Sequence, residues 1–593
     1  MDQVLVSVRH ISSGDESGTE KKSEALDYSR SGFNPTTEAR DLLDAFKRYV
    51  VSLVKPRSEQ ADTESADIAN VEKENDQEIN TVAMNNPRTS QESTLFKKIM
   101  DEAYLTVFNQ MPIHMLIFRS DGTAARLGDR NTVWRDVSER LQRELDQSEP
   151  GFYTKRQIPW LVKKYTKYAI LSHTWLRGAP GEVTYADWMR GALKDTSAGY
   201  AKLENFCRVA AVEHGLNLGW MDTVCINKES SSELDESIRS MYKWYKSASV
   251  CITYLADTAS LEHMCADKWF TRGWTLQELI APNVMRFYAT DWTELITHPE
   301  PAPHSFPTPK NDKRNAAVLA QIQAATTMTA KELEDPMSVP ISRRMQWAVH
   351  RCVTREEDAA YSLMGIFNVS MFTAYGEGGE RAFGRLVQEI LNSGTRNVLD
   401  IANWGSDKPV YHTHGTSMLI PPGLKSYEFR TEANIEWQLP SDPIMLTHLG
   451  VHLPVLLMPA TPEDFRGPLR PQGGYSAIAI TVTQSGPTVH NLLDRAAFNK
   501  RSQPHQSDAH GTIFGVLNIQ ESLDDVTVPY SECFAVLLKG DVDKMMQPGF
   551  KASGRLKTLR PIVFELKNHN GAKRTILKTD LHKHGMALHR MYL

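Results

Sequence analysis

The residues of this chain best suited to chemistry follow two short apolar runs. The first run, Tyr168-Ala-Ile-Leu-Ser-His-Thr-Trp175, ends in a hydroxyl, an imidazole and an indole, and the second, Leu218-Gly-Trp-Met-Asp222, ends in a carboxylate. Short apolar runs bounded by turn residues are typical of buried strands. In open α/β sheets, ligands bind at the carboxyl ends of the strands. We therefore predict a polar site at this edge, lined by Ser172, His173, Trp175 and Asp222.

Two kinds of catalytic site are poorly supported by the spacing of these residues. In a Ser/His/Asp hydrolase, Ser172 would have to meet His173, but neighbouring side chains leave a strand on opposite faces. The chain also has no G-x-S-x-G elbow. A metal site built from His173, Cys207 and the segment Asp222-Thr-Val-Cys-Ile-Asn227 lacks the short paired spacing of metal ligands. We therefore predict no metal.

A third segment, Trp269-Phe-Thr-Arg-Gly-Trp-Thr-Leu-Gln-Glu-Leu-Ile280, begins a predicted helix that stops at Pro282. Arg272 and Trp274 stand at the entrance of this helix, and Glu278 lies in its early turns. The residue pattern allows two interpretations of Glu278. The carboxylate could pair with a neighbouring arginine, Arg239 or Arg272, or it could lie at the rim of the pocket.

The elements around these motifs alternate between strands and helices. Further strands are predicted at 250–255 and 284–288, and an amphipathic helix at 230–248 is expected to be capped by Ser231 or Ser232. Strands and helices that alternate at short intervals indicate a parallel sheet covered by helices. The glycine-rich stretch 375–385 lacks the Gly-Lys-Ser/Thr of a phosphate-binding loop, and we interpret it as a turn into a helix.

The 593 residues divide into several segments by composition and pattern. We predict an N-terminal segment with one amphipathic helix (1–54), a disordered acidic linker (55–94), a strand and helix lead-in (95–164), an α/β core (165–295), a Pro-rich loop (296–313), a helical extension (314–395) and a separate β-rich C-terminal domain (396–593).

Composition restricts the classes of partner and compartment. The net charge is −5, and Lys and Arg are not clustered, so we expect no nucleic-acid binding. Six dispersed cysteines without a C-x-x-C pair favour reduced thiols inside a cell. The N-terminus has no signal-peptide pattern, and no apolar run reaches the length of a membrane span. We expect a cytoplasmic protein with no membrane span.

Several motifs in order along the chain resemble the fungal heterokaryon incompatibility (HET) domain. They are the run 168–175, then Trp220-Met-Asp-Thr-Val-Cys-Ile-Asn-Lys228, then Glu233-Leu with Ile238, Met241 and Tyr242, and Arg272-Gly-Trp-Thr-Leu-Gln-Glu-Leu279. The segments Thr354–Phe367 and Tyr375-Gly-Glu-Gly resemble the part that commonly follows this domain. The resemblance covers roughly residues 110–395.

The resemblance implies a fungal cytoplasmic protein that triggers programmed cell death after non-self recognition. HET domains are distantly similar to TIR domains, which implies a TIR-like (flavodoxin-like) parallel sheet. Some TIR domains cleave NAD with a glutamate, and Glu278 occupies the matching position here. NAD would then be a substrate, with no other cofactor, and Trp175 or Trp274 would stack on a base.

The resemblance also implies self-association and an unidentified partner for non-self recognition. Two positions depart from the family pattern: Leu176 stands where glycine is usual, and Asn227 stands where aspartate is frequent. The departure at Asn227 removes a carboxylate that could have acted as an acid. Two alternatives to an NAD-cleaving effector stay open, namely a non-enzymatic signalling module and a hydrolase that uses Ser172.

Overall fold

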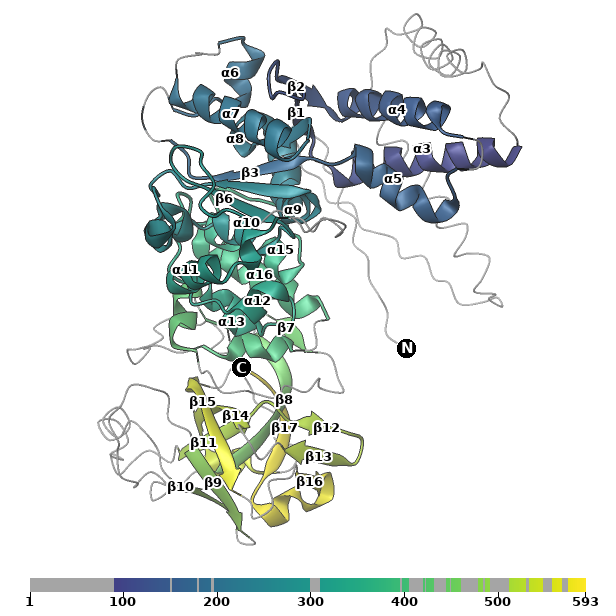
Figure 1. Ribbon diagram of the computed structural model, residues 1–593. Helices are drawn as coiled ribbons and strands as arrows, with labels where there is room; N and C mark the ends of the chain where they lie inside the picture. Colours follow the sequence, from purple (N-terminus) through teal and green to yellow (C-terminus); the bar gives the residue numbers. More distant parts are fainter. Residues whose placement is uncertain are drawn as a thin grey trace, which may run out of the picture. The chain divides into compact units, whose positions relative to one another are not determined.

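In the computed structural model, the description covers residues 90–593 apart from a set of short gaps (Figure 1). The gaps are residues 150–151, 177, 179–180, 193–196, 299–309, 395–396, 405–419, 422, 431–443, 448–449, 460–477, 484–485, 491–510, 529–532, 548–556 and 568–573. The predicted N-terminal helix, nearly all of the acidic linker and most of the Pro-rich loop lie outside the described residues. The first described helix, α3 (Ser90–Gln110), begins inside the stretch that we predicted to be linker.

A six-stranded sheet organises the first part of the described chain. Its strands are β1 (His114–Ile117), β2 (Arg126–Asp129), β3 (Ala169–His173), β4 (Leu218–Trp220), β5 (Val250–Tyr254) and β6 (Met285–Tyr288). The strand order is β2-β1-β4-β3-β5-β6. The strands β4, β3, β5 and β6 are parallel, while β1 pairs antiparallel with both β2 and β4. The predicted parallel sheet with helices is therefore present, but the lead-in adds an antiparallel edge to it.

The four parallel strands have the order 2-1-3-4 when they are counted along the chain. In such an order, the connections run to opposite sides of the first strand, and ligands bind at the carboxyl end of the strands near that reversal. Here the first strand is β3, which lies between β4 and β5. Every residue of β3 is buried. The strand that carries Ser172 and His173 is therefore central to the sheet and covered on both faces.

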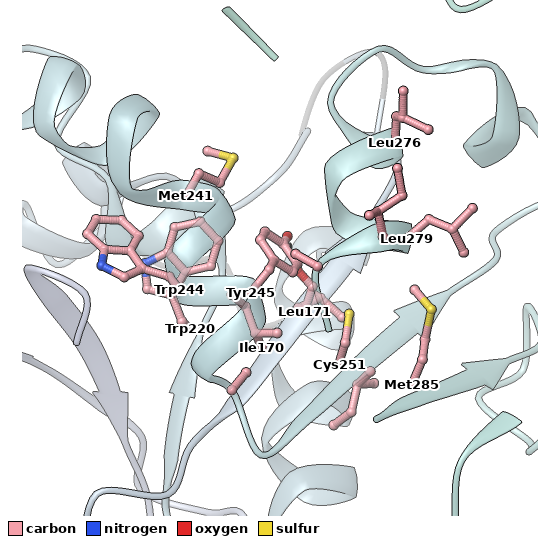
Figure 2. Packing of buried hydrophobic residues seen from close by; sticks show 14 of the residues in the cluster. Ile170, Leu171, Trp220, Met241, Trp244, Tyr245, Cys251, Leu276, Leu279 and Met285 are labelled. Carbon is pink, nitrogen blue, oxygen red and sulfur yellow. Dashed lines mark hydrogen bonds between the residues drawn. The ribbon is translucent and has the colours of Figure 1, made fainter. Parts of the chain in front are cut away.

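The core of this part is built largely from aromatic side chains. Helix α9 (Ser231–Ser247) places Trp244 and Tyr245 beside Trp220 of β4, with 5.7 Å between the two indole centroids (Figure 2). The cap of this helix lies one residue before the first of the two caps that we predicted. Ser230 is extended, and its side chain accepts a hydrogen bond from the Glu233 N–H, so Ser230 is the cap in place of Ser231 or Ser232.

The segment 268–280 is not one helix as predicted. It consists of a 3₁₀ turn, η4 (Lys268–Thr271), and a separate helix, α10 (Thr275–Ile280). Between them, Gly273 donates to the Cys352 carbonyl at 2.9 Å and the Thr271 carbonyl accepts from Cys352 N–H at 2.6 Å. These backbone groups bond to a distant segment, so they cannot continue a helix. A Cβ at Gly273 would lie 2.4 Å from Val353 Cγ1, which shows how closely the two segments approach.

Helices make up most of the remaining elements before residue 400. They are α4 (Arg130–Gln147), α5 (Ile158–Tyr165), α6 (Tyr185–Met189), α7 (Ala198–Arg208) with its π-helical continuation η2 (Val209–Glu213), α8 (Asp222–Cys225), α11 (Ala316–Thr326), α12 (Ala330–Glu334), α13 (Ile341–Gln346), α14 (Asp358–Tyr361), α15 (Met364–Phe367) and α16 (Gly379–Asn392). The glycine-rich stretch before α16 is a turn. The Glu357 carboxylate accepts hydrogen bonds from the backbone N–H groups of Gly376 and Gly378 at 2.8 and 3.1 Å.

The C-terminal part is a separate β-rich region. An eight-stranded sheet contains β7 (Met445–Thr447), β8 (Gly450–Pro459), β9 (Ile478–Thr483), β10 (Gly486–His490), β11 (Gly511–Val516), β14 (Cys533–Gly540), β15 (Lys557–Lys567) and β17 (Ala587–Tyr592). A three-stranded sheet contains β12 (Gln520–Glu521), β13 (Asp525–Val528) and β16 (Arg574–Leu577). Strand β8 lies between β11 and β17, and its residues Val451, Leu453, Val455 and Leu457 are fully buried.

Among the described residues, no helix combines the length and the apolar character that a membrane crossing requires.

The contact between α9 and α15 predicts that alanine substitutions at two glycines have opposite effects on the free energy of unfolding. A Cβ at Gly365 would lie 2.1 Å from the Cβ of Tyr242, whereas a Cβ at Gly384, inside α16, would meet nothing within 4 Å. We expect Gly365→Ala to lower the free energy of unfolding by about 1–3 kcal/mol through overpacking. Gly384→Ala should raise it by about 0.5–1 kcal/mol because alanine favours the helix. Urea denaturation of both variants measures this, and equal effects would contradict the packing described here.

Candidate functional site

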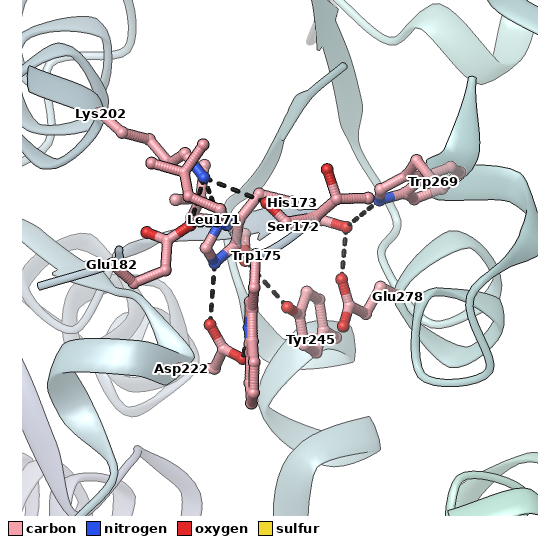
Figure 3. A network of polar contacts seen from close by, with 12 residues as sticks. Leu171, Ser172, His173, Trp175, Glu182, Lys202, Asp222, Tyr245, Trp269 and Glu278 are labelled. Atoms are coloured by element: carbon pink, nitrogen blue, oxygen red, sulfur yellow. Dashed lines mark hydrogen bonds and ion pairs between the residues drawn. The ribbon is translucent and has the colours of Figure 1, made fainter. Parts of the chain in front are cut away.

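The two polar side chains at the end of β3 take part in two separate networks (Figure 3). Ser172 contacts Glu278 of α10, while His173 contacts Asp222 of α8 and Lys202 of α7. This separation follows from the strand itself, because successive side chains leave it on opposite faces. The site is therefore best described as two halves that share one strand.

The first half joins His173, Asp222 and Trp175. The Nε2 atom of His173 lies 2.9 Å from Asp222 Oδ1, and the Trp175 indole N–H donates to Asp222 Oδ2 at 2.8 Å. Burial acts to raise the pKa of Asp222. The hydrogen bonds from His173 and Trp175 and the charge of Lys228 outweigh that effect, so the pKa lies well below its ordinary value. Asp222 is therefore a stable carboxylate at neutral pH.

A buried ion pair continues this half beyond His173. The Nζ atom of Lys202 lies 3.1 Å from His173 Nδ1 and donates to the Thr174 carbonyl at 3.1 Å and to the carboxylate of Glu182. A lysine ammonium can only donate, so Nδ1 of His173 accepts and its Nε2–H donates to Asp222. Burial lowers the pKa of Lys202, and Glu182 opposes this shift. These contacts fix the tautomer and orientation of the imidazole.

Our sequence analysis missed Lys202 and Glu182. The signal that could have found Lys202 is its position on α7, four residues before the buried Phe206 and next to the buried Leu203. A lysine on a core-facing stripe needs a partner, because an unpaired buried charge is costly. No comparable signal exists for Glu182, which follows a loop. It reaches the site because its carboxylate also accepts the Leu176 N–H at 2.7 Å.

The second half of the site is centred on Glu278, in the first turn of α10. The Ser172 hydroxyl donates to the Glu278 carboxylate and accepts a hydrogen bond from the Trp269 indole N–H at 2.8 Å. Ser172 is fully buried and Glu278 is only 7% exposed. Since the Ser172 proton is directed to Glu278 and not to His173, this hydroxyl has no base of the kind that a serine hydrolase requires.

The environment of Glu278 favours its protonated form. Burial raises its pKa to about 8, the negative charge of Asp222 adds to that shift, and the hydrogen bond from Ser172 and the charge of Arg272 oppose it. At pH 7 the carboxyl group is therefore mainly neutral. Neither arginine considered in the sequence analysis forms an ion pair with it within the described part of the chain. Arg239 pairs with Asp235 at 2.8 Å.

The helical extension holds the entrance of α10 in place. Arg351 donates to the Arg272 carbonyl at 2.8 Å and to the Thr275 hydroxyl at 2.9 Å, immediately before the backbone bridge between Cys352 and the residues around Gly273. The Trp274 indole hydrogen-bonds with Asp358 of α14. Trp274 thus bonds to the extension and not to the polar residues at the end of β3.

Trp175 forms the exposed part of the site. Its side chain is 42% exposed, and two cations lie over its ring. Lys228 Nζ is 3.9 Å and Arg272 Cζ is 5.3 Å from the ring centroid. These are cation–π contacts. The described residues contain no group of three His, Cys, Asp or Glu side chains that could hold a metal ion.

Comparison with known proteins shows what this part of the chain resembles. The family profile described as heterokaryon incompatibility protein (HET) matches residues 168–263. This segment is therefore similar to the HET domain. It includes β3, α7, β4 and α9, and therefore both His173 and Asp222, whereas Glu278 lies beyond the matched residues. No solved structure shows a significant match to the chain.

One known protein is similar to this chain over more residues than the family profile. The vegetative incompatibility protein HET-E-1 of Podospora anserina is 38% identical over 245 residues. The match covers 38% of this chain and 16% of the relative. The chain therefore spans only a small share of the length of the relative that it matches.

Replacement of the buried Lys202 by an uncharged residue should lower the stability of the protein strongly. We expect Lys202→Met to cost about 3–5 kcal/mol of unfolding free energy, because Glu182 would keep a buried charge without its partner. The control is Lys268→Met, which breaks an ion pair of 2.9 Å between the exposed side chains of Lys268 and Asp257. That change should cost about 0–1 kcal/mol. Urea denaturation compares them, and a loss for Lys202→Met as small as that of the control would contradict the buried ion pair.

The protonation of Glu278 predicts a pH-dependent stability. The folded chain holds this proton up to about pH 8, whereas the unfolded chain releases it near the ordinary value of 4.5, so this residue makes stability fall as pH rises between these values. Glu278→Gln removes the effect. We expect the variant to gain stability relative to the wild type, by a few kcal/mol, between pH 5 and pH 9. Urea denaturation across that range measures it.

The exposed Glu229→Gln is the matched control for this measurement and should follow the wild-type pH profile. If Glu278→Gln also followed that profile, the carboxyl group would not hold its proton in the folded state.

Proposed function

We propose that this chain is an effector of heterokaryon incompatibility in fungi, and that its HET region promotes cell death after non-self recognition by cleaving NAD. One observation carries the enzymatic part. A buried glutamate, Glu278, is hydrogen-bonded to Ser172 at the carboxyl end of the central strand β3. The name of the relative, a vegetative incompatibility protein, supports the biological part.

The strand order supports a TIR-like interpretation of the fold. The order 2-1-3-4 of the parallel strands is that of flavodoxin-like sheets, in which the carboxyl edge near β3 is the position of the ligand. Glu278 and Trp175 both lie close to this edge. In TIR domains that cleave NAD, a glutamate on a helix later in the chain than the first strand is the catalytic group, and we assign that role to Glu278 of α10, which lies between β5 and β6 in the chain.

The chemistry requires an anion beside the ribose. When the bond between C1′ and the nicotinamide nitrogen breaks, nicotinamide leaves as a neutral molecule and positive charge develops on the ribose. A carboxylate at Glu278 would stabilise that charge, and water would then add to C1′. Lys228 and Arg272, which lie over Trp175, would attract the phosphates of the dinucleotide. NAD is the substrate in this proposal, and no further cofactor is needed.

The closed state of the site suggests how activity would be controlled. In the single chain, Glu278 is almost fully buried and mainly protonated. A positively charged nicotinamide ring beside it would favour the carboxylate, but the ring needs access. We propose that self-association shifts the segment around Arg272 and Gly273 and opens this access, so that isolated chains are inactive.

A non-enzymatic signalling module is the second candidate, and a specific observation favours it. The side chains of Ser172, His173 and Asp222 all have hydrogen-bond partners within the protein. A network satisfied in this way can serve to hold the end of β3 in a fixed shape. In that case the exposed Trp175 and its two cations would be part of a protein-binding surface.

Nicotinamide release separates the two candidates. We expect the purified full chain, assayed with NAD at high protein concentration or on a crowding surface, to release nicotinamide, and Glu278→Gln to lower the rate at least 100-fold. The rate should rise between pH 7 and pH 9, because the carboxylate form of Glu278 becomes populated as pH passes about 8.

The control is Glu229→Gln, which should retain full activity. In parallel, each variant is expressed in fungal cells and cell death is counted. An absence of nicotinamide release combined with undiminished killing by Glu278→Gln would exclude the enzymatic proposal and support the signalling module.

A further inference from the structure

We propose that a cavity beside β5 and β6 binds an organic polyphosphate, a molecule that joins a ring system to two or more phosphate groups. This is the chemistry of a nucleoside polyphosphate. The inference does not depend on the NAD-cleaving proposal, because it concerns different residues.

The cavity has a volume of about 1080 Å³. Its wall includes the residues that lead into β5 and β6, Ser249 and Val284, together with residues from the end of α5, the residues after η2 and the end of α9. The wall also includes Asp291, Trp292, Thr293 and Glu294 of the loop after β6, so the cavity extends from the beginning of β5 and β6 to the end of β6. None of its lining residues belongs to the site around Ser172 and Glu278. Ligand pockets typically have volumes of several hundred to about 1,000 Å³, so a molecule of nucleotide size fits.

Cations surround the mouth of this cavity. Five Lys or Arg residues line it against three acidic residues. Three of the cations, Lys163, Lys167 and Lys246, are exposed. Within the described part of the chain, their ammonium groups have no hydrogen-bond or ion-pair partner. They come from two separate elements, α5 with the turn after it and α9, and the fold brings them to one opening.

All three acidic residues of the wall have partners within the protein. Asp291 accepts hydrogen bonds from the N–H and the hydroxyl of Thr293 at 3.0 and 2.6 Å. Glu294 pairs with the buried Arg286, and Glu213 accepts a hydrogen bond from the Tyr288 hydroxyl at 2.8 Å. His214 also contacts that hydroxyl, at 3.2 Å. Burial lowers the pKa of His214 to about 4, so the imidazole is neutral and does not add to the charge. The positive charge available to a ligand therefore comes from the lysines at the mouth.

The inner wall of the cavity is apolar. Leu216, Val250 and Trp292 line it and are nearly buried. A ligand made of phosphates alone would leave this surface unused, whereas a ring system would cover it. The combination of an apolar wall with a cationic mouth therefore favours a ring joined to phosphates. An extended nucleic acid is disfavoured, because the cations surround a cavity and do not form a stripe, and the net charge of the chain is −5.

Isothermal titration of the full chain with ATP, GTP, adenosine and tripolyphosphate tests the proposal. We expect ATP or GTP to bind, with adenosine and tripolyphosphate at least 10-fold weaker, and binding to weaken as salt is raised because the contacts are ionic. The triple variant Lys163→Glu/Lys167→Glu/Lys246→Glu should lower the affinity at least 10-fold. The control, Lys97→Glu/Lys98→Glu/Lys331→Glu, changes exposed lysines elsewhere and should bind as the wild type does.

Glu278→Gln should also leave the affinity unchanged, which distinguishes this cavity from the proposed NAD site. Circular dichroism verifies that the charge-reversed variants are folded. The proposal is overturned if neither nucleotide binds at millimolar concentration, if the triple variant binds as tightly as the control, or if tripolyphosphate binds as tightly as the nucleotides. Binding to phosphoinositide vesicles without binding to soluble nucleotide would overturn it in favour of a lipid headgroup.

Discussion

The arrangement of this protein depends on the need to satisfy polar side chains at the end of a fully buried strand. Ser172 and His173 have no access to water, so each must find its hydrogen-bond partners inside the protein. Strand alternation sends them to opposite faces, and a different set of helices meets each one. Helix α10 brings Glu278 to Ser172, while α7 and α8 bring Lys202 and Asp222 to His173. The positions of these helices are thereby coupled to a single strand.

The same constraint shifts the pKa values of Asp222 and Glu278 in opposite directions. Asp222 receives hydrogen bonds from His173 and Trp175 and lies near Lys228, so it stays ionised. Glu278 accepts a hydrogen bond from Ser172 and lies near the charge of Arg272, but burial and the charge of Asp222 outweigh both effects, so it keeps its proton. Pairs of acids with pKa values moved in opposite directions are characteristic of functional sites, although structural networks produce them as well. The helical extension belongs to this site too, because Arg351 and Cys352 fix the backbone from which α10 starts.

Much of the fold can be predicted from local pattern. The apolar runs at 168–172, 218–222, 250–255 and 284–288 correspond to β3, β4, β5 and β6, because a strand buried on both faces must be apolar nearly throughout. The division of 269–280 into η4 and α10 could not be predicted, since it results from hydrogen bonds with Cys352, about eighty residues away in the chain. The antiparallel pairing of β1 could not be predicted from the sequence either, because the direction of pairing depends on how the chain returns to the sheet.

The sequence by itself determined that the chain resembles a HET domain, that two of its strands end in polar residues and that Glu278 lies in a helix between the strands at 250–255 and 284–288. Residue type and spacing carry that information, because burial and periodicity act within a few residues of each other. Only the tertiary structure decided which partners meet: Ser172 with Glu278, His173 with Lys202, and three lysines around one cavity beside β5 and β6. The physical reason is that charge pairing and hydrogen bonding depend on distance in space, and distance in space is set by the packing of the whole domain.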